Sequence, residues 1–391
     1  MLAAPLSPSV PVLDQLASAM AGAATRPVSP AGLLAVFAQV ADPAKRRGTR
    51  HRLPVVLTLA TCAVLAGARS FTAIAEWAAD ASETVRDMLG IVRVPDASTF
   101  RRVLARLDAD ALDTALGAWA AAATTPTKGR RRRIAVDGKT LRGSRHGDRP
   151  GRHLLAAFDQ QHHVVLAQRG VDAKTNEIPE LTALLGALDL AGAVVTADAL
   201  HTQRDTATWL VERGAHYVLV AKANQPALYA QLTALPWNRV ATRVPTRDRG
   251  HGRVETRTVK ATELRAGINF PHAVQAIQIT RRRSLNGGPT TTETIHAITS
   301  LPTHQASPVL LADLTRDHWS VENRLHWVRD VTYDEDHHRA RTGNAPQVMA
   351  SLRNLAISIL RLSGTTNIAQ ALRHHARRPE RPLTTIMNLN C

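Results

Sequence analysis

Two stretches indicate the fold: IAVDGKT at residues 134–140 and VVTADALH at residues 194–201. Each is an apolar run typical of a buried strand, and each delivers one aspartate, Asp137 or Asp198, at its carboxyl end. Gly138 is expected to let the chain turn tightly after the first strand. If the two strands pair, the carboxylates lie side by side, where Mg²⁺ takes one or two carboxylates together with substrate phosphate. Either aspartate alone is compatible with a solvated or capping residue, so the metal-site hypothesis depends on the pair.

The sequence around these runs alternates between strand and helix patterns. The expected order is β-β-β-α-β-α-β, with strands at 134–137, 153–158, 163–170, 193–197 and 216–221 and helices at 178–188 and 203–213. Short turns between the early strands, followed by helical crossovers, predict a mixed sheet with helices on its faces. This order matches the RNase H-like fold, and we predict an α/β protein of that class.

The flanking sequence predicts further units. Helical spacing over 53–124 indicates a small all-α domain, with Asp96 or Ser98 as one helix cap. Strand-prone runs around Asn286-Gly287-Gly288 indicate a β-rich insertion, and a helix at 345–362 begins with Asn344 as cap and Pro346 in its first turn. The expected boundaries are a weakly ordered arm at 1–41 with a short helix near 12–22, a helical domain at 42–125, a first part of the catalytic core at 126–227, the β-rich insertion at 228–305, a second part of the core at 306–370 and a basic tail at 371–391.

A third motif, RDHWSVENRLHWVRD, occupies residues 316–330. Val321, Leu325 and Val328 form an apolar seam at helical spacing. His318, Glu322, His326 and Arg329 fall on a neighbouring face, so one helix presents an acid flanked by cationic groups. A solvated helix face with ordinary i, i+4 pairs is the alternative, and both tryptophans are then simply core residues.

Charge and cysteine content narrow the class of partner. The 391 residues carry 49 Lys plus Arg against 32 Asp plus Glu, a net charge of +17 that favours a polyanion such as nucleic acid. An Arg-rich solvated surface is the alternative, and it applies equally to the basic runs at 130–133, 281–283 and 373–381. With 2 cysteines, neither a disulfide framework nor a cysteine metal site is expected, and we expect a cytoplasmic protein without membrane spans.

At these motifs the chain resembles the ISAs-type insertion-sequence transposases, a branch of the bacterial DDE transposases with an RNase H-like core. The resemblance runs from about 42 to 365 and includes DGKTLRGS at 137–144, KTNEIPEL at 174–181, TADALHTQ at 196–203, HGRVETR at 251–257 and HWSVENRLHWVRDVTYDED at 318–336. It implies that Asp137, Asp198 and Glu322 are the catalytic, metal-binding acids. Where the broader group has a Tyr, an Arg and a Lys around the third acid, this chain has Thr315, His318 and Arg329, and the rival acids are Asp330, Glu335 and Asp336.

The resemblance also implies an activity. We expect metal-dependent DNA cleavage at the ends of an insertion sequence and strand transfer into target DNA, with two Mg²⁺ ions, or Mn²⁺ in their place, and a homodimer that synapses two ends of double-stranded DNA. The helical region at 42–124 is the candidate reader of DNA sequence. Phosphate neutralisation supplies most non-specific DNA affinity, and the candidate DNA contacts are Lys139, Arg142, Lys222, Asn224, Gln225, His318, His326 and Arg329.

Two other functions remain open on the sequence. A regulatory DNA binder whose catalysis has decayed would keep the fold, although the intact acids argue against it. A host nuclease for junctions or RNA–DNA hybrids would cut specific structures without strand transfer.

Overall fold

A computed structural model describes residues 32–44, 50–126, 129–172, 177–242, 246–250, 253–264, 268–285 and 288–389. The chain forms two compact units. We call residues 125–140 and 152–327 the sheet unit, and residues 1–124, 141–151 and 328–391 the helical unit. The short helix expected near 12–22 and the turn residues Asn286 and Gly287 lie outside the described residues.

The sheet unit is built on five strands in the order β3-β2-β1-β4-β5. Antiparallel pairing joins β1 to β2 and β2 to β3, whereas β1, β4 and β5 run parallel. The bounds are β1 Arg133–Thr140, β2 His153–Asp159, β3 Val164–Val171, β4 Val194–Ala197 and β5 His216–Ala221. The predicted mixed sheet and element order are confirmed, and the fold is RNase H-like.

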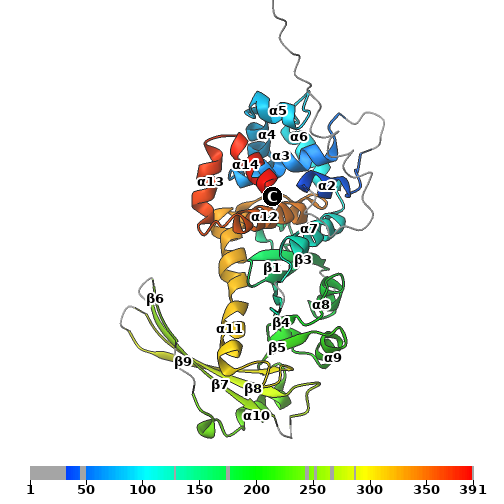
Figure 1. The fold of residues 1–391 in the computed structure, drawn as a ribbon. Helices are drawn as coiled ribbons and strands as arrows, with labels where there is room; N and C mark the ends of the chain where they lie inside the picture. Colours follow the sequence, from blue (N-terminus) through cyan, green and yellow to red (C-terminus); the bar gives the residue numbers. More distant parts are fainter. Residues whose placement is uncertain are drawn as a thin grey trace, which may run out of the picture. The chain divides into compact units, whose positions relative to one another are not determined.

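Helices cover both faces of this sheet. α8 (Glu177–Leu185) packs on β2 and β3, and α9 (Arg204–Glu212) packs on β5. α11 (Pro308–His318) packs on β1, β4 and β7 from the opposite face (Figure 1). β2, β4 and β5 are covered on both faces and are nearly continuous apolar runs, whereas β3 alternates buried and partly exposed residues.

The strand-rich segment extends the same sheet. β9 pairs antiparallel with β5, so the order continues as β5-β9-β8-β7-β6 and the sheet has 9 strands. The bounds are α10 Pro226–Thr233, η3 Trp237–Arg239, β6 Thr246–Gly250, β7 Arg253–Glu263, β8 Gln275–Leu285 and β9 Thr291–Thr299. Val194 and Val218 of the central strands share one apolar cluster with Ile277, Ala297 and Leu311. The apolar core is therefore continuous from the central strands into this segment.

The helical unit packs around α12 (Ala345–Leu362), which contacts α3, α6 and α7 and is almost entirely buried. The remaining bounds are α2 Leu33–Ala38, α3 Leu53–Leu65, α4 Phe71–Ala79, α5 Glu83–Met88, α6 Ala97–Arg106, α7 Ala109–Ala123, η1 Arg142–Ser144, η6 Glu335–His337, α13 Ile368–Ala376 and α14 Glu380–Asn388. Asp96 caps α6 by accepting from the Thr99 amide, as expected. Asn344 precedes α12 as predicted but makes no side-chain cap bond to it, and its Nδ2 donates to the Leu107 carbonyl instead.

The third motif adopts π-helical geometry, with η4 at Glu322–His326 and η5 at Val328–Thr332. Such wide turns are rare in proteins, and where they occur they are often part of a functional site. Val321, Leu325 and Val328 are buried, which confirms the predicted apolar seam. No described helix is long and apolar enough to cross a membrane.

Candidate active site

The two aspartates occupy equivalent positions on adjacent parallel strands. The β1–β4 register ends with Val136 opposite Ala197, and Asp137 and Asp198 are the next residue on each strand. The predicted pairing is therefore confirmed. The expected strand end at Asp137 is wrong, because β2 continues to pair with β1 as far as Thr140. Asp137 thus lies where the parallel pairing stops but the antiparallel pairing holds its backbone.

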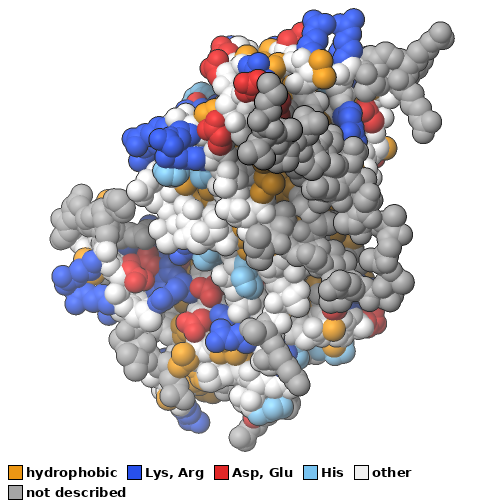
Figure 2. Space-filling model, turned by 45° about the horizontal axis from the view of Figure 1, so that its top comes forward, with side chains coloured by type: hydrophobic (Ala, Val, Ile, Leu, Met, Phe, Trp, Pro, Cys, Tyr) orange, Lys and Arg blue, Asp and Glu red, His pale blue; other side chains and the backbone are white. Residues whose placement is uncertain are grey.

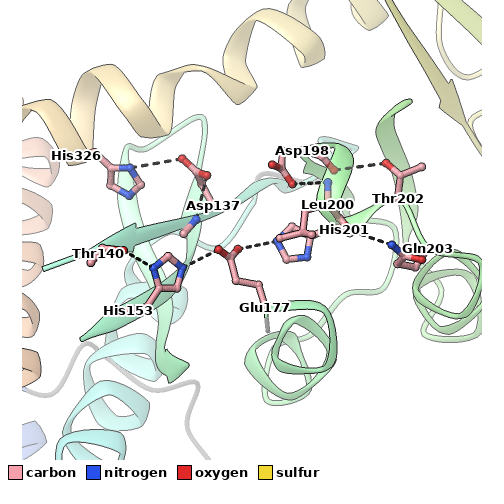
Figure 3. A network of polar contacts seen from close by, with 11 residues as sticks. Asp137, Thr140, His153, Glu177, Asp198, Leu200, His201, Thr202, Gln203 and His326 are labelled. Atoms are coloured by element: carbon pink, nitrogen blue, oxygen red, sulfur yellow. Dashed lines mark hydrogen bonds and ion pairs between the residues drawn. The ribbon is translucent and has the colours of Figure 1, made fainter. Parts of the chain in front are cut away.

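Glu322 and His326 complete a cluster around Asp137 in the sheet unit. His326 Nδ1 lies 3.4 Å from Asp137 Oδ2 and 3.2 Å from Glu322 Oε2. One ligand atom from each of the three residues falls within 4.8 Å of the others. Asp198 is exposed beside this cluster, and its Oδ1 accepts from the Leu200 amide at 3.0 Å (Figure 3). The structure therefore brings Glu322 to Asp137 and leaves the Asp198 carboxylate open to solvent on the neighbouring strand.

The electrostatics of this cluster favour a cation. Burial raises the pKa of Asp137, with a smaller opposing effect from His326, and the charges of Glu322 and Asp198 raise it further. The hydrogen bond with His326 lowers the pKa of Glu322 and keeps that carboxylate ionised. His326 Nε2 is buried and has no hydrogen-bond partner among the described residues. Carboxylate oxygens with one imidazole form a donor set that suits a divalent metal ion.

Behind the aspartates lies a bridge that the sequence interpretation missed. Glu177, the first residue of α8, bridges two histidines (Figure 3). Its Oε1 lies 2.6 Å from Nε2 of His153 in β2, and its Oε2 lies 3.1 Å from Nε2 of His201 in η2 (Ala199–His201), the short helix that follows Asp198. The far nitrogen of His153, Nδ1, lies 2.8 Å from Thr140 Oγ1. Although burial opposes the effect, hydrogen bonds from both histidines lower the pKa of Glu177 to about 2. The signal in the sequence was the KTNEIPEL motif, in which Glu177 is an acid without an assigned role.

Gly138 is required by this bridge and not by a turn. It lies within β1, paired with Leu155. A Cβ at this position would lie 2.5 Å from Glu177 Oε1 and 2.6 Å from His153 Nε2. The expected tight turn is therefore wrong, and the glycine instead lets a carboxylate and an imidazole approach the strand backbone.

His318 joins α11 to the central strand. It is buried, its Nδ1 lies 3.0 Å from Thr196 Oγ1, and burial lowers its pKa to about 4. Thr315, which stands where the broader group has a Tyr, bonds to the backbone carbonyls of Leu311 and Ala312. His318 is thus neutral and turned into the fold at neutral pH, which does not favour the expected phosphate contact.

Arg329 is also turned inward, within the helical unit. It is 1% exposed, and its Nε donates to Glu335 Oε2 at 2.8 Å. Arg353 Nη1 donates to the other oxygen of Glu335 at 2.9 Å. Because the guanidinium neutralises a buried carboxylate, the expected contact of Arg329 with DNA has no accessible surface in this structure. Glu335, one of the rival acids, is likewise committed to two arginines.

The other candidate DNA contacts divide into braces and exposed cations. Asn224 Nδ2 donates to the Ala199 carbonyl at 2.6 Å, and Gln225 Nε2 to Gln203 Oε1 at 3.3 Å, so both support the segment after Asp198. Three cations remain accessible: Lys139, which is partly exposed and whose charge lowers the pKa of Glu322, and the exposed Lys222 and Arg142.

Comparison with known proteins gives this geometry a family. Residues 128–359 match the family model described as "Transposase DDE domain", and residues 34–120 match the model described as "DDE_Tnp_1-associated". The chain belongs to the DDE transposase family. This transposase is 29% identical over 341 residues to "Putative transposase YncI" of Escherichia coli O157:H7, covering 84% of this chain and 87% of that protein. It is 33% identical over 264 residues to "Uncharacterized protein in dhlA 3'region" of Xanthobacter autotrophicus, covering 64% and 88%.

Another relative by sequence agrees with that membership. "H repeat-associated putative transposase YhhI" of Escherichia coli K12 is 28% identical over 329 residues, covering 79% of this chain and 85% of that protein. Among solved structures, a piggyBac transposase synaptic complex with hairpin DNA is similar with a TM-score of 0.43 and 10% identity, covering 91% of this chain and 78% of that chain. The family confirms the resemblance seen in the motifs. This DDE transposase is a DNA-processing enzyme of transposition, and its family implies the use of a divalent metal.

Proposed function

We propose that this transposase cleaves DNA at the ends of an insertion sequence and joins the freed 3′ ends to target DNA, with Asp137, Asp198 and Glu322 as its catalytic acids. The observation that supports this most is the β1–β4 register, which sets Asp137 beside Asp198, together with the approach of Glu322 to Asp137 through His326. Asp137 and Glu322 both lie near His326, and Asp198 follows the adjacent parallel strand, which supports assigning the three acids to one site.

The acids would hold Mg²⁺, or Mn²⁺ in its place, as two ions. Bound there, such ions supply activation of an attacking water or 3′-hydroxyl and stabilisation of the departing oxygen. The chain's own residues orient these groups. The Glu177 bridge fixes the segment that carries Asp198, and the hydrogen bond from His326 keeps Glu322 ionised. No covalent enzyme intermediate is required, so the same acids serve both cleavage and strand transfer.

The substrate we propose is double-stranded DNA. The net charge of +17 favours a polyanion, and Lys139 and Lys222 are accessible cations in the sheet unit that carries the acids. Because transposition must bring two element ends together, we propose that a homodimer holds one end in each copy. The helical region at 42–124, most of which matches the transposase-associated family model, is the proposed reader of the element end.

The test is cleavage of a labelled duplex that carries the flanking element ends, with Mg²⁺ or Mn²⁺. Wild type is compared with Asp198→Ala and Glu322→Ala, and end binding of each protein is measured in parallel without divalent metal. Cutting at the end by wild type alone, with binding retained in both variants, is the expected result.

Two outcomes would overturn the proposal. Tight end binding without cutting by folded wild type would favour a regulatory DNA binder. Cutting of junctions or RNA–DNA hybrids without strand transfer would favour a structure-specific nuclease.

A further inference from the structure

A basic hollow lies on the helical unit, whereas the residues proposed to hold metal belong to the sheet unit. Two segments surround it, residues 142–147 and residues 336–341, and its volume is about 470 Å³. Arginines line it from both segments, together with one acid and one histidine: Arg142, Arg145, Asp336, His337, Arg339 and Arg341. We call this feature the arginine hollow.

The positive charge of the arginine hollow is largely uncompensated. Arg142 lies 3.7 Å from Asp336, but its side chain is 79% exposed, so this pair is weak. Arg341 Nε donates to the Gly143 carbonyl at 3.5 Å. Among the described residues, no carboxylate forms an ion pair with Arg145 or Arg339. A concave surface with several cations and one acid concentrates a positive potential and attracts anions.

The backbone of the arginine hollow is held in place before any ligand binds. A Cβ on Gly143 would lie 2.2 Å from the His338 carbonyl oxygen, so the two segments are in close backbone contact. Glu335 is fixed by Arg329 and Arg353, both buried. At the far end the Asn344 amide donates to the Ala105 carbonyl at 3.0 Å. Because the walls are anchored to the core, a ligand would not need to order the backbone, which favours binding.

The side chains of the arginine hollow suit a row of consecutive phosphate groups. Arg339 and Arg341 are exposed and both line the arginine hollow, whereas Ala340 between them is buried. A planar guanidinium presents paired N–H groups that match two phosphate oxygens, and it remains charged at every physiological pH. Four arginines from two segments provide more guanidinium groups than a single phosphate requires. Basic side chains also gather in clusters on the face shown in Figure 2, with histidines beside some of them.

We propose that the arginine hollow binds consecutive phosphates of the DNA backbone and forms a docking surface separate from the catalytic acids. This inference rests on the proposed function, since it takes DNA as the ligand. It adds Arg145, Arg339 and Arg341 to the DNA contacts of the chain. It also gives Arg142, which follows Asp137 by five residues in sequence, a specific place in that surface.

The test is the salt dependence of DNA binding by the full chain. Binding is measured by the fluorescence anisotropy of a labelled duplex that lacks the element end. Divalent metal is omitted, so catalysis does not contribute. The double variant Arg145→Gln/Arg339→Gln is compared with Arg239→Gln/Arg247→Gln, which removes the same charge from two exposed arginines of the sheet unit. Each lost phosphate contact lowers the slope of log affinity against log salt by about 0.9, so the first variant should lose about 1.8 and the control almost nothing.

Three results complete the test. Arg145→Lys/Arg339→Lys keeps both charges and should retain most of the wild-type slope, which shows that the loss in the Gln variant is not unfolding. Equal slopes for the hollow and control variants, or no duplex binding by wild type, would overturn the proposal. Asp198→Ala and Glu322→Ala should bind with the wild-type slope, so failure of cleavage and failure of the arginine hollow are separable.

Discussion

Gly138→Ala is the substitution for which the structure gives the sharpest expectation. The added methyl carbon would lie 2.5 Å from Glu177 Oε1 and 2.6 Å from His153 Nε2, distances that van der Waals contact does not allow. The β1 backbone is held by β2 on one side and, up to Val136, by β4 on the other, so the flexible end of Glu177 should move first. The alanine therefore displaces the carboxylate from its bridge between two histidines.

The magnitude follows from the contacts that are lost. Glu177 accepts one hydrogen bond from His153 and one from His201, and a hydrogen bond to a charged group contributes about 1.5–3 kcal/mol net. Replacing glycine in an extended strand returns about 0.4–1 kcal/mol by restricting the unfolded chain. We expect Gly138→Ala to reduce the free energy of unfolding by about 2–5 kcal/mol, although it adds apolar surface and removes no side-chain contact of its own.

A double-mutant cycle with Glu177→Ala isolates the cause. Urea unfolding of wild type, the two single variants and the double variant gives the coupling energy between the two positions. If the clash with Glu177 carries the cost, Gly138→Ala should cost less than about 1 kcal/mol once the carboxylate is gone, because only His153 has still to move. Additivity of the two substitutions within about 0.5 kcal/mol would refute the role assigned to Gly138.

Three further predictions follow from the buried charges. The fold lowers the pKa of Glu177 from 4.5 to about 2, so the ionised carboxylate stabilises the protein fully above pH 4.5 and progressively less as the pH falls towards 2. The difference in unfolding free energy between wild type and Glu177→Gln should therefore narrow by up to about 3 kcal/mol from pH 5 to pH 2. Glu335→Ala leaves two buried guanidinium groups uncompensated and should cost about 3–5 kcal/mol in urea unfolding, whereas Glu76→Ala on an exposed face should change stability by less than about 0.5 kcal/mol. If His326 is a metal ligand, His326→Ala should weaken the affinity for Mn²⁺ about tenfold and the affinity for Mg²⁺ less, because imidazole favours the softer ion. Both affinities are measured by calorimetry, and equal losses for the two ions would count against ligation by His326.

The sequence predicted the central sheet well because burial on both faces leaves a clear signal. Strands β2 and β5 lie within one residue of their expected bounds, since their residues form almost continuous apolar runs. β1 was expected to end at Asp137, but it continues to Thr140 through pairing with β2, a strand that begins 13 residues further along the chain. Such long-range pairing overrides the local change from apolar to polar residues. α5, a single short helix of 6 residues, has too little periodicity to be recognised.

The site was harder to predict because side-chain partners come from distant segments. Asp137, Asp198 and Glu322 were chosen by strand position and family resemblance, and these cues specify backbone location. Arg329 was placed on the face of an ideal helix, but π-helical turns widen the spacing and the residue enters a buried pair with Glu335. Helical periodicity at 3.6 residues does not describe such a segment.

The structure separates the acids that stabilise the fold from those that are available to metal. Glu177 contacts two histidines and Glu335 two arginines, so each of these carboxylates already has cationic or hydrogen-bonding partners on both oxygens. Asp137 is in the opposite situation: burial and the neighbouring acids raise its pKa, and His326 compensates only in part. Burying a charge is costly unless it is paired, so a divalent cation is the partner that this remaining carboxylate lacks within the described chain. Of the acids proposed to be catalytic, Asp137 is therefore the one that the fold leaves without sufficient positive charge, whereas His326 and Lys139 lower the pKa of Glu322.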